Sequence, residues 1–181
     1  MIEENWLVKA NIDTTPFEDA LAKCKHIKDV SGTTSAIGPN TKQLEIFDGF
    51  EYINLMTDEL KTIFTGDIIN DKIDLSKPHK LSLWSVEGGE HSYHRLHRHS
   101  MAGDEHLRIN NCLSTVFYLN VPDEKNNPQF YFILEKNKGT EYHTITPKKG
   151  DLFIFPWSVY HGVYPQGPGL RKTVNLDFEF I

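Results

Sequence analysis

The second half of the chain consists of short apolar or alternating segments that are separated by turn residues. Aromatic and β-branched residues dominate these segments, which is typical of β-strands. No helical segment comes between them, so antiparallel sheets are expected and not a parallel α/β fold. The predicted strands are residues 81–86, 112–121, 129–135, 142–145, 151–155 and 172–180.

The first eighty residues show helical spacing instead. The sequence TPFE at residues 15–18 joins a capping-box pattern to a proline at the first helical position, and apolar residues continue at helical spacing as far as Ile27. Residues 30–42 are rich in Ser, Thr, Gly, Pro and Asn, which predicts a surface loop. A second helix, ending before Gly66, is predicted by the spacing of Ile53, Met56, Leu60, Ile63 and Phe64.

Helices followed by strands predict a mainly β, α+β fold, in which helices pack on one outer face of an antiparallel jelly roll. We expect a single domain over residues 1–181, with a helical support over 1–79 and a jelly-roll core over 80–181. The last strand can line a polar interior with one face and meet the helices with the other. The polar face holds Arg171, Thr173 and Asn175, and the apolar face holds Val174, Leu176, Phe178 and Phe180.

The composition of the chain bears on nucleic-acid binding, on the redox compartment and on membrane contact. The 181 residues carry a net charge of -6 and have a pI near 5.8, so no overall positive charge favours nucleic acid. Cys24 and Cys112 lack metal-type spacing and indicate a reducing compartment. No apolar run reaches membrane-spanning length, and the N-terminus lacks the basic start of a secretion signal. A cytoplasmic location without membrane contact is therefore expected.

Histidines give the strongest chemical signal. Five of the nine histidines lie between His91 and His106. Since His97 and His99 are two residues apart, both imidazoles leave the same face of an extended segment. His161 follows residues 150–156, which alternate and end at a proline, so it is expected at the mouth of a sheet. We predict that His97, His99 and His161 bind one metal ion.

The second half of the chain contains, in this order, the motifs WSVEGG at 84–89, HRHS at 97–100, LSTVFYL at 113–119, GDLFIFP at 150–156, His161 and RKT at 171–173. In their order and spacing these motifs resemble the iron(II)- and 2-oxoglutarate-dependent oxygenases, especially small prolyl-hydroxylase-like members from phages and bacteria. The resemblance covers roughly residues 80–181 and implies a double-stranded β-helix. It also implies that His97, His99 and His161 hold iron(II) on one face and leave adjacent positions for 2-oxoglutarate and oxygen.

The same resemblance implies roles for three further residues. Arg171 stands where these oxygenases bind the distal carboxylate of 2-oxoglutarate, and a planar guanidinium suits a carboxylate because the two form paired hydrogen bonds. Thr173 and Tyr118 are expected to add hydroxyl contacts to this cosubstrate. The implied activity is most simply that of a hydroxylase, which couples decarboxylation of 2-oxoglutarate to oxidation of a peptide side chain or a metabolite.

One position departs from the common pattern of these oxygenases. Most members have Asp or Glu as the second ligand, where this chain has His99, and three neutral imidazoles leave the ion with its full double positive charge. Asp104 or Glu105 could instead supply a carboxylate from the following loop. Four other histidines are expected to lie in loops, at the surface or beside the metal ligands. They are His91, His94, His106 and His143.

Two other interpretations fit the sequence. A cupin shares the jelly roll, and residues 150–161 match its second motif, so a three-histidine dioxygenase, an isomerase or a small-molecule sensor is an alternative. A non-catalytic interaction protein would close its metal site with a fourth protein ligand. Arg171 with Thr173 favours the oxygenase, because a cupin needs no carboxylate anchor there. Trp84 and Trp157 are expected to be packing residues and not substrate platforms.

Overall fold

The structure is a computed structural model that describes residues 7–33, 35–64, 79–99, 112–136 and 139–180. These residues form two α-helices, α1 (Thr15–Ala22) and α2 (Phe50–Ile63), and a short 3-10 helix, η1 (Ser31–Thr33). Strands dominate the rest, as the predicted fold class requires. They are β1 (Val8–Asn11), β2 (Ile27–Asp29), β3 (Thr41–Ile46), β4 (His79–Gly88), β5 (His94–His97), β6 (Cys112–Asn120), β7 (Phe130–Lys136), β8 (Gly139–Ile145), β9 (Asp151–Pro156), β10 (Tyr160–Val163) and β11 (Arg171–Phe180).

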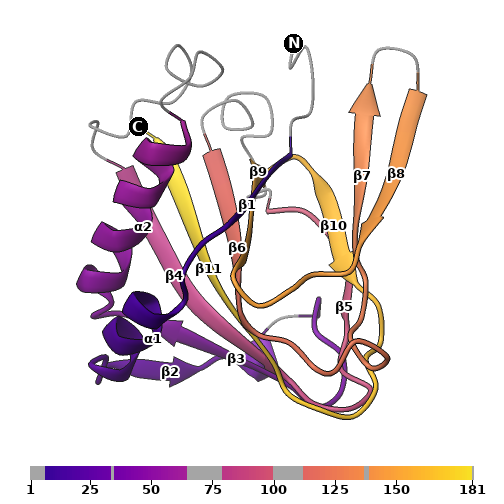
Figure 1. The fold of residues 1–181 in the computed structure, drawn as a ribbon, viewed down its shortest axis with the longest axis horizontal. Coiled ribbons are helices and arrows are strands. Elements are labelled where there is room, and N and C mark those ends of the chain that lie inside the picture. Colours follow the sequence, from indigo (N-terminus) through magenta and orange to yellow (C-terminus); the bar gives the residue numbers. More distant parts are fainter. Residues whose placement is uncertain (1–6, 34, 65–78, 100–111, 137–138, 181) are drawn as a thin grey trace.

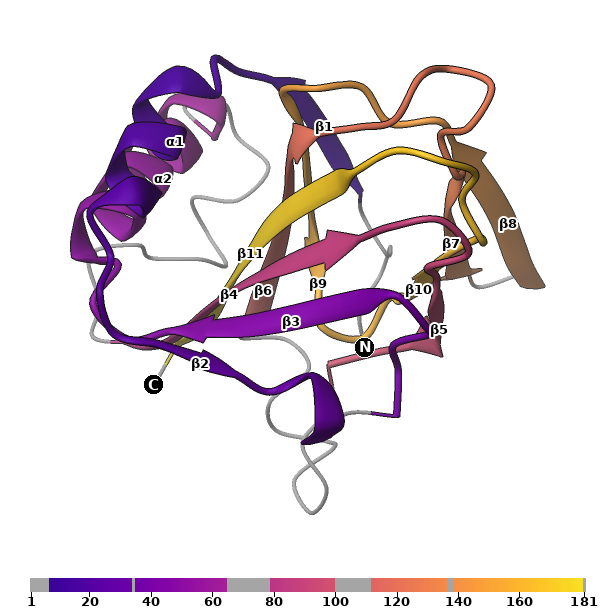
Figure 2. The same cartoon turned by 90° about the horizontal axis from the view of Figure 1, so that it is seen from below.

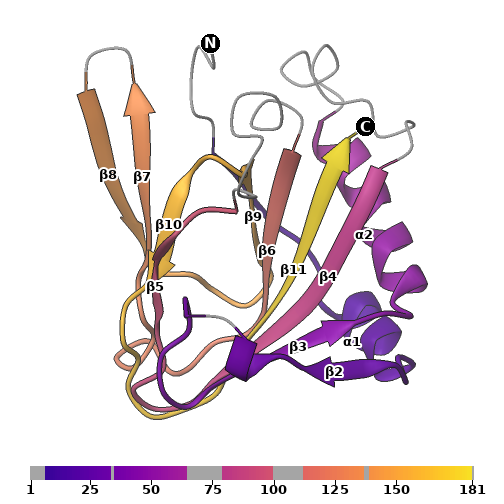
Figure 3. The same ribbon diagram turned by 180° about the vertical axis from the view of Figure 1, so that it is seen from behind.

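The strands form two antiparallel sheets that face each other (Figure 1). The larger sheet has seven strands in the order β1-β9-β6-β11-β4-β3-β2, and the smaller sheet has four in the order β5-β10-β7-β8. Neighbours in the chain, such as β4 and β5 or β9 and β10, therefore belong to different sheets. Figure 3 shows β5 and β10 of the smaller sheet across from β6 and β11 of the larger sheet. This arrangement confirms the predicted jelly roll.

Both helices pack on the outer face of the larger sheet, on the side away from β7 and β8 (Figure 2). Buried residues of α2, such as Tyr52 and Met56, share one hydrophobic core with side chains of this sheet. The members of this core on β11 are Val174, Leu176 and Phe178. The predicted apolar face of the last strand is thus confirmed, while the side chain of Phe180 lies outside the described part. Within the described residues, neither helix is long and apolar enough to cross a membrane.

A second core fills part of the space between the two sheets. It is largely aromatic, and the rings of Phe130 and Phe153 meet edge to face with centroids 5.2 Å apart. Aromatic pairs favour this geometry because the positive ring edge meets the negative ring face. The inner face of β11 also borders this space with Arg171, Thr173 and Asn175. The polar interior wall that the sequence predicts is therefore present.

Helix α1 is shorter than predicted. It ends at Ala22, whereas the helical spacing continues to Ile27, which instead begins β2 and pairs with Ile46. The predicted capping box does not form. The Thr15 N–H instead donates to Oδ1 of Asp13 at 3.0 Å, so a carboxylate satisfies one of the free N–H groups at the start of the helix.

The N-terminal half also contributes strands that the sequence pattern does not show. Strands β1, β2 and β3 extend the larger sheet, although residues 1–79 are predicted to be a helical support. Every residue of β2 is exposed, so no apolar period marks it as a strand. The predicted loop over residues 30–42 contains η1 and the start of β3. The division of the single domain into a support and a core stays a prediction.

Replacement of Gly150 by alanine is expected to lower the free energy of unfolding by at least about 2 kcal/mol. Gly150 has a φ of +86°, and an added β-carbon would lie 2.7 Å from the Ile12 carbonyl oxygen. Its N–H donates to the Tyr118 carbonyl and its own carbonyl accepts from the Ile12 N–H, so the backbone cannot move freely. Urea denaturation would measure the change. Gly32→Ala is the control, because apart from its chain neighbours no described residue has an atom within 4 Å of the added carbon. Equal losses in both variants would contradict this account.

Candidate metal and cosubstrate site

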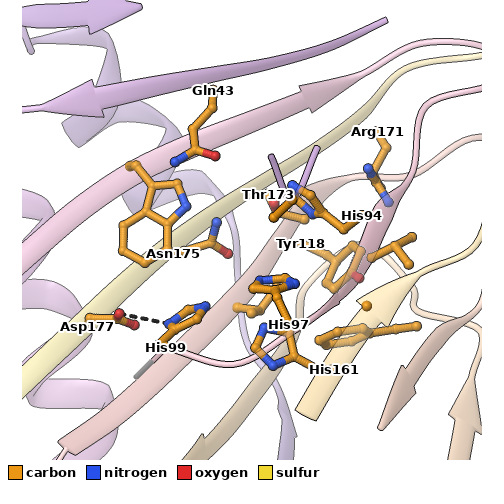
Figure 4. A pocket seen from close by; sticks show the side chains of 16 residues that line it. Gln43, His94, His97, His99, Tyr118, His161, Arg171, Thr173, Asn175 and Asp177 are labelled. Carbon is orange, nitrogen blue, oxygen red and sulfur yellow. Dashed lines mark hydrogen bonds and ion pairs between the residues drawn. The ribbon is translucent and has the colours of Figure 1, made fainter. Parts of the chain in front are cut away.

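Three histidines converge in the space between the sheets (Figure 4). His97 ends β5, and the pairing of β5 with β10 places His161 opposite it. His99 follows β5, where its N–H donates to the Trp157 carbonyl at 3.1 Å. The ring centroids are 4.3 Å apart for His97 and His161, and 5.0 Å apart for His99 and His161. One ligand atom from each histidine lies within 4.8 Å of the other two, so one ion between them could contact all three.

Each of these imidazoles is oriented by a contact at Nδ1. Nδ1 of His97 lies 2.7 Å from a backbone carbonyl oxygen, Nδ1 of His161 lies 2.9 Å from another, and Nδ1 of His99 lies 2.8 Å from Oδ2 of Asp177. Since all three partners accept, Nδ1 carries the proton and Nε2 keeps a free lone pair. Burial lowers the pKa of His97 to about 4 and the pKa of His161 well below its ordinary value. Both rings are therefore neutral near pH 7, as metal ligands must be.

Asp177 and Ser114 hold His99 in this orientation. Their strands pair so that the two residues lie opposite each other, and the Ser114 hydroxyl donates to Oδ1 of Asp177 at 2.5 Å. Both side chains are buried. His99, which stands where most of these oxygenases have a carboxylate ligand, thus forms a hydrogen bond with the carboxylate of Asp177 (dashed in Figure 4). The two-residue period that relates Arg171 to Asn175 continues to Asp177, so the sequence pattern places Asp177 on the inner face of the strand but does not show its contact with His99.

The Asp177→Asn variant is expected to bind iron(II) about 10- to 100-fold more weakly than the wild type. The amide keeps the size of the side chain but removes the negative charge that strengthens His99 as a ligand. Anaerobic titration with iron(II) against a competing chelator would measure the affinity. Asp123→Asn is the matched control, because Asp123 is exposed between β6 and β7. Equal affinities in the Asp177→Asn variant and the wild type would show that this carboxylate does not support the site.

A cavity of about 230 Å³ lies beside the histidines and is also lined by Arg171, Thr173 and Tyr118. The Arg171 side chain is 1% exposed, and its Nε, Nη1 and Nη2 have no hydrogen-bond partner among the described residues. Burial lowers its pKa from the ordinary value. A buried guanidinium is unfavourable without an anion, because nothing replaces its lost hydration. The cavity therefore fits a ligand that carries a carboxylate.

Tyr118 and Gly88 lie beside Arg171 and make this end of the cavity suitable for an anion. The buried Tyr118 hydroxyl has no partner among the described residues, and burial raises its pKa, so it stays protonated and can donate. Gly88 allows the close approach of β4 to Arg171, since an added β-carbon would lie 3.1 Å from Nη2. Thr173 lies opposite Tyr118 in the pairing of β11 with β6. The three predicted cosubstrate residues thus face one small space.

The fold brings all six predicted site residues to the same cavity, and the other histidines that the structure describes do not belong to the metal group. His91 and His143 are exposed. His94 lines the cavity but does not belong to the group of three potential ligands. Asp104, Glu105 and His106 lie outside the described residues. The six residues are His97, His99, His161, Arg171, Thr173 and Tyr118.

The family model for 2OG-Fe(II) oxygenases matches residues 82–177, which is more than half of the chain. The chain belongs to this family. It is therefore an iron(II)- and 2-oxoglutarate-dependent oxygenase, which confirms the predicted enzyme class and cofactors and decides against the cupin alternative. A search of curated protein sequences gave no match.

Solved structures of low sequence identity share the fold. A prolyl-4-hydroxylase from Pseudomonas putida superposes with a TM-score of 0.67 at 17% identity, over 98% of this chain and 94% of that one. The collagen prolyl hydroxylase of Paramecium bursaria Chlorella virus-1, in complex with 2-oxoglutarate, gives 0.64 at 13% identity, over 97% of each chain. HygX from Streptomyces hygroscopicus, with nickel, 2-oxoglutarate and hygromycin B bound, gives 0.64 at 12% identity, over 97% of this chain and 83% of that one.

Proposed function

We propose that the protein is a hydroxylase in which His97, His99 and His161 hold iron(II), while Arg171, Thr173 and Tyr118 hold 2-oxoglutarate. The observation that carries this assignment is the buried Arg171, whose three nitrogens have no partner among the described residues. Iron binding alone would not require a buried cation close to the histidines. A dicarboxylate that reaches from the ion to Arg171 accounts for both groups at once.

The residues of the chain have separate tasks in this proposal. When bound, iron(II) and 2-oxoglutarate supply the chemistry: one O2 is consumed, 2-oxoglutarate becomes succinate and carbon dioxide, and one oxygen atom enters a C–H bond of the substrate. Arg171 fixes the distal carboxylate, and the Tyr118 hydroxyl donates a hydrogen bond to it. The Nδ1 contacts of the histidines hold Nε2 toward the ion position. The walls of the small cavity limit the access of water.

Anaerobic titration of the iron-loaded protein with 2-oxoglutarate tests the proposal. Chelation of iron(II) by the keto acid gives a visible charge-transfer band, which we expect to saturate. The matched ligand is 2-oxopentanoate, which keeps the keto acid and replaces the distal carboxylate by a methyl group. We expect it to bind at least about thirtyfold more weakly, because it cannot pair with Arg171. No band with 2-oxoglutarate, in protein that has bound iron, would overturn the assignment.

The primary substrate is proposed to be a peptide side chain or a small metabolite. The similar structures include a prolyl hydroxylase from Trichoplax adhaerens in complex with a peptide fragment of hypoxia inducible factor, and HygX with hygromycin B. Both kinds of substrate are thus bound by proteins of this fold. The cytoplasmic location stays a prediction from the sequence, and cell fractionation would test it.

A further inference from the structure

Neutral polar side chains and an indole line one part of the cavity, beside the metal and cosubstrate residues. Gln43 and Asn175 lie on the other side of Thr173 from Arg171 (Figure 4). Asn175 pairs with Trp84 across β11 and β4, and Gln43 pairs with the next inner-face residue of β4. Side chains at such positions are neighbours on one face of a sheet. Gln43, Trp84 and Asn175, here called the amide patch, therefore form a continuous surface that lines the cavity.

The two carboxamides of the amide patch have no hydrogen-bond partner among the residues that the structure describes. Asn175 is only 6% exposed, and neither its side chain nor that of Gln43 makes a hydrogen bond to another described residue. Gln43 is partly exposed, and the polar atoms of Asn175 are not among the fully buried atoms without a partner, so both carboxamides remain accessible to a ligand in the cavity. Polar groups inside folded proteins are usually paired, which favours a ligand that pairs with them. Each carboxamide offers both a donor and an acceptor. A peptide group, which also has one donor and one acceptor, is the complementary ligand.

The charged residues near the amide patch and the position of its indole favour an uncharged peptide ligand. Asp177, two residues after Asn175 on β11, is a charged residue of the cavity lining, and it already forms hydrogen bonds with His99 and Ser114. Glu45 pairs with Trp84 but does not line the cavity. The indole of Trp84 lies with its ring centroid 5.6 Å from that of His99. An aliphatic group that packs on this indole would therefore lie next to the proposed iron position.

We propose that the amide patch is the primary-substrate subsite and that it takes an uncharged peptide segment. In this arrangement Gln43 and Asn175 bind a peptide group, and Trp84 packs against an aliphatic side chain whose C–H bond is oxidised. The inference rests on the proposed function for the position of the iron. It also revises the role of one tryptophan. Trp157 donates to the Leu113 carbonyl and packs as the sequence predicts, whereas Trp84 is assigned to the substrate.

Side-chain NMR signals of the zinc-loaded protein with 2-oxoglutarate bound would test the subsite directly. The probe is N-acetyl-leucine N′-methylamide at millimolar concentration, and the matched charged probes are the corresponding aspartate and lysine compounds. We expect the leucine probe to shift the indole N–H signal of Trp84 and the carboxamide signals of Gln43 and Asn175. We expect Gln43→Ala and Asn175→Ala each to weaken this binding about fivefold, the effect of one hydrogen bond. Gln129→Ala, at an exposed position before β7, is the control.

The outcomes separate the subsite from the proposed function. If 2-oxoglutarate binds but no uncharged probe shifts the three signals, the subsite is wrong and the cosubstrate site stands. If 2-oxoglutarate does not bind, the proposed function is wrong, and the probe shifts still report whether the amide patch binds a peptide group. Equal or tighter binding of either charged probe would overturn the uncharged class. Equal effects of Gln43→Ala and Gln129→Ala would overturn the role of Gln43.

Discussion

The His161→Ala variant is expected to bind iron(II) at least about a hundredfold more weakly than the wild type. Loss of a residue that only supports a ligand costs about 10- to 100-fold in metal affinity, so loss of a ligand should cost no less. His97, His99 and His161 form the one group of three potential metal ligands within the described residues. His161 is also 4% exposed, so its removal leaves a gap inside the cavity and not at the surface. Elemental analysis after anaerobic loading, followed by chelator competition, would measure the loss.

The matched control is His143→Ala, because His143 is exposed on β8 and contacts Glu141 outside the cavity. It should keep wild-type iron content. Thermal unfolding without metal would show that both variants are folded, so that a loss of iron reports on the site. Wild-type iron affinity in the His97→Ala and His161→Ala variants would contradict the three-histidine assignment. If His99→Ala alone retained iron, Asp104 or Glu105 would become the preferred ligand.

The strands that carry the site could be predicted because each has its own two-residue period. On β11 this period separates the cavity-lining residues from the side chains that meet the helices. The separation can be read from the sequence of β11 alone, because it does not depend on the neighbouring strands. Strands at the margin of the larger sheet lack such a signal. β1 alternates only between partly buried and exposed residues, and it is held by pairing with β9, far away in the chain. Its position depends on a non-local contact that no local pattern encodes.

The six residues predicted to bind the metal and the cosubstrate could be named from the sequence, and they do meet at one cavity, but the groups that support them could not be named. The spacing of His97 and His99 indicates a shared face, strand alternation puts Arg171 on the polar face of the last strand, and the family resemblance implies its role. The hydrogen bond between Asp177 and His99 requires β11 of the larger sheet to lie near the residues that follow β5. Strand β5 belongs to the smaller sheet, so this contact depends on how the two sheets pack. Gln43 likewise reaches the cavity only because β3 pairs with β4. Residues whose roles depend on contacts between distant strands can be assigned only in the folded molecule.

The Arg171→Ala variant is expected to lose about 2 to 5 kcal/mol of 2-oxoglutarate binding, a loss of roughly thirtyfold or more, with iron content unchanged. The variant removes the guanidinium that the buried distal carboxylate needs as a partner. Arg171→Lys should recover only part of the affinity, because an ammonium cannot form the paired hydrogen bonds of a guanidinium. Calorimetry with an inert divalent metal in the site would measure these values. Arg95→Ala, on an exposed position of β5, is the matched control.

Stability measurements distinguish a cosubstrate anchor from a structural arginine. Without 2-oxoglutarate, Arg171→Met should be as stable as the wild type or more stable, because an apolar chain of similar length replaces a buried cation that has no hydrogen-bond partner in the described part of the chain. With 2-oxoglutarate, the wild type should gain about 2.7 kcal/mol at a hundredfold excess over its Kd, and the variant should gain less than about 1 kcal/mol at the same concentration if its affinity is at least about thirtyfold lower. A large loss of stability in the ligand-free variant would mean that Arg171 supports the fold. Equal stabilisation of both proteins by 2-oxoglutarate would remove Arg171 from the cosubstrate site.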